Sequence, residues 1–361
     1  MSSIVYYISG HGYGHAVRSK QVIQSLKKAC PELEIRVRTT APKWLLDDPI
    51  FSVSHFHQAI DVGIVQTDSL QMELGQTWRA CQALHCRIPQ VVERELAFIS
   101  QHDVRLILGD IPPLCFEIAA RASIPSVAVS NFSWNWIYRA FLKIYPNFLP
   151  LIEEMETFYR KATLALALPY PGNMEVFPRR DLIPWIARTS SLTKEEARKR
   201  FGLPQSGSVV LLSFGGVGLK RLPRDRLKEL SNFFFIVTGG SKKQEGNLLT
   251  LPDAQRNYED LIRAADVIVT KPGYGIVADI IAHQVPILYT ERGEFPEYPL
   301  LVQALSDLAT AEFIPQKDLL SGNIAPYLTR LLDKDQNWPS VQLDGAKVAT
   351  EKVLALLDHF S

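Results

Sequence analysis

The sequence lacks an excess of charge of either sign. Its 361 residues include 39 lysines and arginines against 38 aspartates and glutamates, which gives a formal net charge of +1. Most nucleic-acid-binding proteins depend on an excess of basic side chains that attracts the phosphate backbone. Because this chain has no such excess, we expect no nucleic acid among its partners.

Cysteine is also scarce, and the four present are Cys30, Cys81, Cys86 and Cys115. None of them belongs to a CxxC pair, so we expect reduced thiols, which are typical of the cytoplasm. The chain enters a strand-like run at 4–8 with no basic region ahead of a long apolar stretch. A secretion signal is therefore not expected.

Long apolar runs are missing as well, since none reaches the about 18 residues that cross a bilayer. The longest candidate, 131–150, is rich in aromatic residues but is interrupted by Arg139, Lys143 and Pro146. This segment does not predict a membrane span. Peripheral contact of its aromatic side chains with a lipid surface stays open.

Short β-rich runs alternate with longer helical patterns in both halves of the chain. Strands are predicted at 4–8, 34–39, 104–108, 126–129, 209–213, 233–238, 267–270 and 286–289. Helices are predicted at 16–28, 113–122 and 345–359. This alternation is typical of parallel sheets covered by helices on both faces. The sequence therefore predicts an α/β fold with two doubly wound, Rossmann-like units.

The boundary between the units is predicted from a change to polar composition around 179–204. Within it, 191–198 has the pattern of a capped surface helix that ends near Gly202. A chain of this length also exceeds the usual size of one domain. We expect an N-terminal, acceptor-side domain over 1–186, a C-terminal nucleotide-sugar-binding domain over 187–340, and a closing helical segment over 341–361.

A glycine-rich turn follows the first strand and contains Gly10, Gly12 and Gly14. Glycines at a strand-to-helix turn let backbone N–H groups approach a ligand closely, although a purely conformational role is the alternative. The third glycine comes one residue early for the dinucleotide fingerprint GxGxxG. The second strand ends in Thr39 and Thr40, where the ribose of NAD would need an acidic residue. An NAD enzyme is thus disfavoured.

Two titratable residues are expected at the carboxyl edge of the first sheet. His15 begins the helix after the glycine turn, and Asp110 ends the strand at 104–108. A histidine there is suited to general base catalysis, and a carboxylate is suited to orienting it. The alternatives are that His15 packs the turn and that Asp110 caps the helix that follows.

The most specific pattern in the second half is a buried strand that runs into Lys271-Pro272-Gly273-Tyr274-Gly275 and then a helix. The first N–H groups of such a helix are suited to receive phosphate oxygens. Asp279, about one helical turn further on, is a candidate to bind ribose hydroxyls.

Other strand ends supply further candidates for donor binding. Small residues that allow close backbone approach to a diphosphate occur in Phe214-Gly215-Gly216 and at Gly239. After the strand at 286–289, Glu291, Glu294 and Glu297 crowd into a loop where a carboxylate is suited to binding sugar hydroxyls, or is merely a surface charge.

Aromatic residues follow the strand at 126–129 in Asn131-Phe132-Ser133-Trp134-Asn135-Trp136. Trp134 and Trp136, with Asn131 and Ser133, are candidates to contact the acceptor by stacking and hydrogen bonding, and ordinary packing is the alternative.

Together these motifs resemble GT-B fold glycosyltransferases, in which two Rossmann-like domains face a cleft. The resemblance extends over nearly the whole chain to the N-terminal, glycosyltransferase-like region of plant L-arabinokinases and to stand-alone bacterial relatives. It rests on the segments 9–15, 130–134, 214–216 and 271–275. The sugar kinase half of those plant proteins has no counterpart here, so arabinose phosphorylation is not implied.

The resemblance implies inverting transfer from a nucleotide-diphosphate sugar to an acceptor hydroxyl. His15 would be the base and Asp110 its acidic partner, while Gly273 to Gly275 hold the diphosphate. Asp279 would bind the ribose and Glu297 the sugar. UDP is the commonest donor in the resembling families, no metal or other cofactor is usually required, and the acceptor would be a small or lipid-linked molecule.

Two other functions stay open on the sequence alone. A nucleotide-sugar epimerase or hydrolase would use the same diphosphate site with further acids and bases, which the Glu291 to Glu297 cluster supplies. A nucleotide-sugar sensor would bind without turnover.

Overall fold

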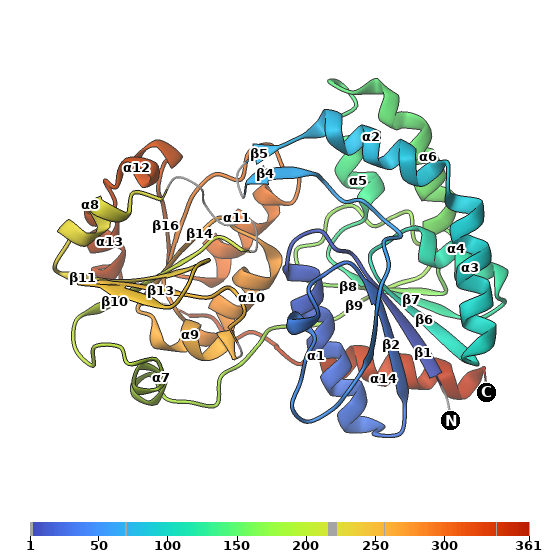
Figure 1. Cartoon of the computed structure of the whole chain (residues 1–361), viewed down its shortest axis with the longest axis horizontal. Coiled ribbons are helices and arrows are strands. Elements are labelled where there is room, and N and C mark those ends of the chain that lie inside the picture. The colour runs from blue at the N-terminus through green and yellow to red at the C-terminus, as the bar shows by residue number, and fades with distance from the viewer. Residues whose placement is uncertain (1–2, 69–70, 216–221, 256, 337, 361) are drawn as a thin grey trace. The chain divides into compact units, whose positions relative to one another are not determined.

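The computed structural model describes residues 3–68, 71–215, 222–255, 257–336 and 338–360 (Figure 1). The chain divides into two compact units. The first comprises Met1–Val65, Glu73–Ile186 and Gln342–Ser361, and the second comprises Gln66–Met72 and Ala187–Val341.

The first unit is built on a seven-stranded sheet with the order β3-β2-β1-β6-β7-β8-β9, in which every pairing is parallel. The strands are β1 (Ser3–Ile8), β2 (Glu34–Thr39), β3 (Ser54–His57), β6 (Val104–Asp110), β7 (Ser126–Ser130), β8 (Leu164–Ala167) and β9 (Arg180–Leu182). All residues of β1 and β7 are buried, as expected for central strands of a sheet covered on both faces.

Helices flank both faces of this sheet. They are α1 (Gly14–Ala29), α2 (Leu74–His85), α3 (Ile88–Gln101), α4 (Leu114–Arg121), α5 (Trp134–Arg139), α6 (Leu149–Tyr159) and α14 (Gly345–His359), with 3-10 turns η1 (Lys43–Leu45) and η2 (Pro146–Phe148). Figure 1 shows α1 and α14 on one face and α3 and α4 on the other. The C-terminal helix thus belongs to the first unit, where it packs against α1.

The second unit contains a seven-stranded sheet with the order β12-β13-β11-β10-β14-β15-β16. Its strands are β10 (Ser208–Ser213), β11 (Phe233–Thr238), β12 (Lys243–Glu245), β13 (Leu248–Leu251), β14 (Val267–Thr270), β15 (Ile287–Tyr289) and β16 (Ala311–Phe313). Only β12 pairs antiparallel among these described strands. The segments β4 (Gln66–Asp68) and β5 (Gln71–Met72) form a separate antiparallel pair.

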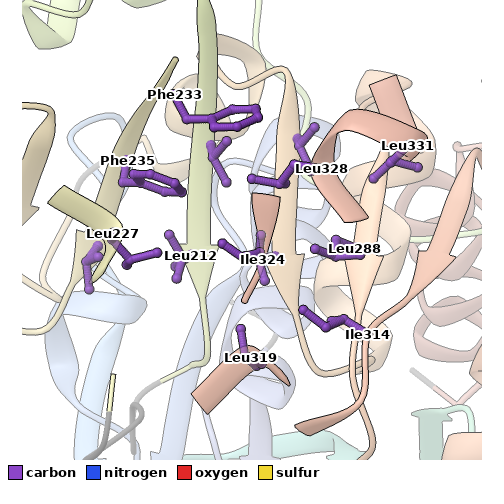
Figure 2. Close-up of a cluster of buried hydrophobic side chains, with 14 of the residues drawn as sticks. Leu212, Leu227, Phe233, Phe235, Leu288, Ile314, Leu319, Ile324, Leu328 and Leu331 are labelled. Carbon is purple, nitrogen blue, oxygen red and sulfur yellow. The ribbon is translucent and has the colours of Figure 1, made fainter. Parts of the chain in front are cut away.

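Seven helices are described in this unit: α7 (Lys194–Phe201), α8 (Arg224–Glu229), α9 (Tyr258–Ala264), α10 (Tyr274–His283), α11 (Tyr298–Leu308), α12 (Gln316–Ser321) and α13 (Ala325–Leu332). Figure 2 shows the core on one face of the sheet, where Leu212, Phe235 and Leu288 meet Leu328 and Leu331 of α13. Burial of this apolar surface is the main driving force for docking α13 on the sheet.

The predicted α/β architecture is confirmed, and each strand and helix expected from the sequence is present. Local signals explain the agreement at α7. The Thr193 hydroxyl caps this helix by accepting a hydrogen bond from the backbone N–H of Glu196, and the Glu196 carboxylate accepts one from the backbone N–H of Thr193. Gly202 ends the helix in a left-handed conformation with φ of 69°. Among the described helices, none combines the length and apolar character needed to cross a membrane.

Candidate active site

The candidate site of the first unit lies where β1, β6 and β7 end. The register pairs Ile8, the last residue of β1, with Asp110, the last residue of β6. Because α1 begins at Gly14, His15 stands in its first turn. Ligands of α/β proteins commonly bind at the carboxyl ends of parallel strands, and the structure brings His15 and Asp110 together at this edge.

His15 and Asp110 form a buried pair. His15 Nδ1 lies 2.7 Å from Asp110 Oδ1, and the two residues are 6% and 0% exposed. Burial raises the pKa of the Asp110 carboxyl, but the charges of Arg18 and His15 outweigh this and hold the pKa below its usual value. Because Asp110 is then a carboxylate, it accepts the Nδ1 proton of His15, which leaves Nε2 to take up a proton.

Arg18 completes this cluster, although its role was not predicted from the sequence. Its Nε donates to Asp110 Oδ2 over 2.6 Å, and a terminal nitrogen donates to Oδ1. Ser19 donates to the same Oδ2 over 3.1 Å. Such a bidentate contact fixes the plane of the carboxylate. The one available sequence signal is that Arg18 follows His15 by three residues and so shares its face of α1.

Two of the predicted acceptor-side residues have contacts within the fold. The side-chain oxygen of Asn131 accepts a hydrogen bond from Arg18 over 2.7 Å, and Asn131 is fully buried. Ser133, also fully buried, donates to the backbone carbonyl of Asn173 over 3.4 Å. Their roles toward an acceptor stay predictions.

The two tryptophans of this segment differ in position. The ring of Trp134 lies 6.1 Å from that of His15, and its Nε1 donates to Asp61 Oδ2 over 3.0 Å. Trp136 packs on Gly172, where an added Cβ would lie 2.5 Å from the indole ring. Trp134 therefore borders the site. Asp61 was not predicted from the sequence, because it lies in an irregular segment after β3.

The glycine turn before α1 leaves room beside its backbone. Gly12 has φ of +68°, a conformation that residues with a side chain rarely adopt. A Cβ added at Gly12 or Gly14 would meet no described atom within 4 Å. The predicted approach of a donor phosphate to these two residues is a hypothesis that the open backbone suits.

In the second unit the predicted turn leads directly into α10. Gly273 is its N-cap residue, and the helix starts at Tyr274 and Gly275. In the described structure no side chain caps this end, and its first turn carries no acidic residue. Lys271 is half-buried just before the turn. The helix end is therefore suited to an anion, since its first N–H groups and dipole both favour negative charge.

The other small residues predicted for donor binding follow neighbouring strands. The end of β10 pairs with the end of β14, where Ser213 lies beside Thr270. Phe214, which is buried, and Gly215 follow β10, and Gly239 follows β11. Gly215 and Gly239 have φ of +71° and +109°. Gly216 lies outside the described residues.

Asp279 forms hydrogen bonds with Arg188 that the sequence did not predict. Its Oδ1 accepts the backbone N–H of Arg188 over 2.8 Å, and its Oδ2 accepts Arg188 Nε over 2.9 Å. Asp279 is 1% exposed. The residue therefore ties the start of the second unit to α10, and its role toward a ribose stays a prediction.

The predicted sugar-binding glutamates lie in different surroundings. Glu297 is buried and forms an ion pair with Arg292, which also donates to the carbonyl of Pro272 over 3.2 Å. Glu294 is exposed. Glu297 is thus linked through Arg292 to the turn before α10, whereas Glu294 is at the surface.

Comparison with known proteins agrees with these features. Residues 2–149 match the family model described as Glycosyl transferase family 1. Over 90% of its length the chain is 29% identical to the L-arabinokinase of Arabidopsis thaliana, of which the match covers 32%. The predicted similarity to plant L-arabinokinases is confirmed. The chain spans about a third of the length of this curated relative.

Solved structures share the fold at low sequence identity. The calicheamicin glycosyltransferase CalG4 has a TM-score of 0.63 at 13% identity, with 99% of this chain and 98% of that chain covered. UGT2 of Phytolacca americana, complexed with UDP-2fluoro-glucose and pterostilbene, has a TM-score of 0.60 at 15% identity, with coverage of 99% and 94%. The predicted GT-B fold is confirmed.

Proposed function

We propose that this glycosyltransferase of the GT-B fold moves a sugar from a nucleotide-diphosphate donor to an acceptor hydroxyl, with His15 as the general base. The observation that carries the proposal is the buried pair of His15 and Asp110 at the carboxyl edge of the first sheet. A histidine held by a carboxylate through Nδ1 presents Nε2 to a substrate in a fixed direction. In the proposed reaction Nε2 takes the proton of the acceptor hydroxyl, whose oxygen attacks the anomeric carbon in one inverting step.

The donor diphosphate is proposed to bind at the N-terminus of α10. A Cβ added at Gly273 would meet no described atom within 4 Å, so the backbone is accessible there, and the first N–H groups would stabilise the charge that grows on the departing diphosphate. We propose UDP as the nucleotide because a structure with this fold was solved with UDP-2fluoro-glucose. No metal is needed in this scheme, since the helix end supplies the electrostatic stabilisation.

The epimerase alternative is less well supported by the second unit. Its candidate acids and bases were the glutamates from Glu291 to Glu297. Glu291 Oε2 accepts hydrogen bonds from Thr290 and from the backbone of Gln316, each over 2.7 Å. Glu297 is held by Arg292. These contacts serve the fold of the loop, whereas the pairing of His15 with Asp110 supports the base role proposed for a transferase.

The proposal is tested by separating donor binding from turnover. Calorimetric titration against UDP, GDP, ADP and TDP, with and without EDTA, should give selective binding of UDP that is insensitive to EDTA and lost in Gly275→Asp. With a UDP-sugar and an acceptor panel, His15→Ala should keep the donor Kd and lose about 10²- to 10⁴-fold in kcat. His359→Ala, on the exposed end of α14, is the control. Normal turnover of His15→Ala would refute the base assignment, and binding of no nucleotide would refute the donor site.

A further inference from the structure

We propose that His11 is a second histidine that contacts the acceptor: its Nε2–H donates a hydrogen bond to the acceptor oxygen while His15 takes the proton from that oxygen. The proposal rests on the proposed function in assigning His15 as the base. It adds a residue of the glycine turn to those predicted for the acceptor side.

The hydrogen bonding of His11 determines which of its ring nitrogens carries the proton. The backbone N–H of Ile64 donates to His11 Nδ1 over 3.2 Å. Since a backbone N–H can only donate, Nδ1 is the unprotonated nitrogen, and the proton of the neutral ring lies on Nε2. His15 has the opposite arrangement, because Asp110 accepts its Nδ1 proton and Nε2 is then an acceptor. The two histidines therefore present one donor and one acceptor at Nε2.

The two rings are close enough to serve one hydroxyl group. Their centroids lie 6.4 Å apart, with an angle of 61° between the ring planes. Two hydrogen bonds of about 2.8 Å that meet at one oxygen span up to about 5.6 Å between their nitrogens. The observed separation allows this span, because each Nε2 lies at the rim of its ring. A hydroxyl group both donates and accepts, so it matches an acceptor at His15 and a donor at His11.

The ring of His11 is held in place by its neighbours. Gly63 packs against it so closely that an added Cβ would lie 2.5 Å from His11 Cβ, and Gly63 has φ of +65°. The hydroxyl of Tyr138 donates to the carbonyl of Gly63 over 2.6 Å and so fixes this segment. The ring of Trp134 lies 5.2 Å from that of His11, at an angle of 89°. A donor fixed in advance needs no reorganisation when charge develops on a substrate.

Two other side-chain donors beside the base are engaged within the fold. The Nε1–H of Trp134 donates to Asp61 over 3.0 Å. The guanidinium of Arg18 donates to both oxygens of Asp110. These hydrogen bonds hold the site together, so neither donor replaces His11 toward the acceptor.

In the proposed step the acceptor hydroxyl gives its proton to Nε2 of His15. Its oxygen bonds to the anomeric carbon as the bond from that carbon to the diphosphate breaks, and His11 keeps its proton throughout. The hydrogen bond from His11 stabilises the negative charge that grows on the oxygen as its proton leaves, so it is stronger in the transition state than in the bound substrate. Loss of this donor should therefore lower kcat with little change in the KM of the acceptor.

The test replaces His11 by two amides that each keep a different part of the ring. In His11→Asn the side-chain oxygen is positioned to accept the Ile64 N–H, but no donor remains at the position of Nε2, whereas the longer side chain of His11→Gln keeps a donor there. With a UDP-sugar and an acceptor panel, His11→Asn should lose about 10²-fold in kcat and keep the donor Kd, and His11→Gln should recover about 10-fold of that loss. Wild-type kcat in His11→Asn, or an equal loss in both variants, would overturn the proposal.

Gly63→Ala disturbs the same ring without replacing His11. Its Cβ would overlap the ring, so kcat should fall as it does in His11→Asn. The matched control is Gly246→Ala, because Gly246 has φ of +61° and its added Cβ would meet no described atom within 4 Å. This control carries similar backbone strain and should keep the wild-type kcat. Wild-type kcat in Gly63→Ala would contradict the role of a fixed ring.

A further measurement uses the wild-type protein without substrates. In ¹⁵N NMR spectra of the histidine rings, assigned with His11→Gln and His15→Gln, His11 should carry its proton on Nε2 and His15 on Nδ1. A proton on Nδ1 of His11 would overturn the proposal whether or not an acceptor is found. If no acceptor is turned over, the proposed function fails, while this spectrum still decides whether His11 is the donor that the proposal requires.

Discussion

Replacing Asp279 by alanine is expected to destabilise the second unit rather than only weaken nucleotide binding. Asp279 accepts the backbone N–H of Arg188 at Oδ1, and at Oδ2 it accepts hydrogen bonds from Nε and one terminal nitrogen of the Arg188 guanidinium. The Arg188 and Asp279 side chains are 16% and 2% exposed. Removing one partner of such a pair leaves the other charge buried, which costs about 3 to 5 kcal/mol.

Hydrogen exchange followed by mass spectrometry measures this loss in the second unit alone. Peptides that cover β14 and α10 should exchange faster in Asp279→Ala. The increase in rate should correspond to a loss of about 3 kcal/mol or more in the free energy of opening. Peptides of β1 and α14 serve as an internal reference. The double variant Arg188→Met, Asp279→Leu is the matched control. It should lose less stability than Asp279→Ala because neither charge of the pair is left buried.

A different outcome would support the ribose role predicted for Asp279. If Asp279→Ala kept wild-type exchange rates, the structural reasoning would be refuted. The ribose role requires wild-type protein to prefer UDP over 2′,3′-dideoxy-UDP, and this preference should vanish in Asp279→Asn. Loss of stability with an unchanged nucleotide preference would show that Asp279 only supports the fold.

Three further predictions concern stability, each measured as a free energy of unfolding in urea. Thr193→Ala removes the cap of α7 and should cost about 1 kcal/mol, whereas a loss below a few tenths would refute its capping role. Gly345→Ala places a Cβ 2.1 Å from the carbonyl oxygen of Pro184 and should cost about 1 to 3 kcal/mol; unchanged stability would contradict this close packing. Burial lowers the pKa of His283, whose Nε2 accepts the N–H of Ser190. Below about pH 6.5 the unfolded chain therefore binds more protons than the folded chain, so the free energy of unfolding should decrease as the pH is lowered. His283→Gln should reduce this dependence of stability on pH.

The sequence predicted the central strands because they are buried on both faces. The strand β1 consists of Ser3 to Ile8, all buried, and β14 consists of four buried residues. Such continuous apolar runs are a strong signal. The edge strands β9 and β12 show no such apolar signal, since their sequences Arg180–Leu182 and Lys243–Glu245 are short and polar. Their pairing depends on a neighbouring strand that is already in place.

The residues of the candidate site can likewise be divided into those that the sequence predicted and those that it did not. His15 and Asp110 were predictable because each follows a recognisable strand, and strand ends meet at one edge. Arg18 and Asp61 were not, because a charged residue in a helix or loop usually faces solvent. Their burial depends on partners 92 and 73 residues away along the chain, namely Asp110 and Trp134. Only the tertiary structure brings such charges together.

The free-energy cost of burying charged side chains around His15 favours an enzyme over a sensor. A protein that only bound nucleotide sugar would need the helix end at Gly273, where backbone N–H groups suffice. Arg18 and Asp110, by contrast, are taken fully out of water beside His15, and desolvation of two charges opposes folding even when they pair. Such clusters of buried, interacting titratable groups are concentrated at catalytic sites. A sensor gains nothing from such a cluster. A general base takes up a proton at each turnover, so it requires an imidazole ring held in a fixed position and a negative charge nearby that stabilises the proton on the ring.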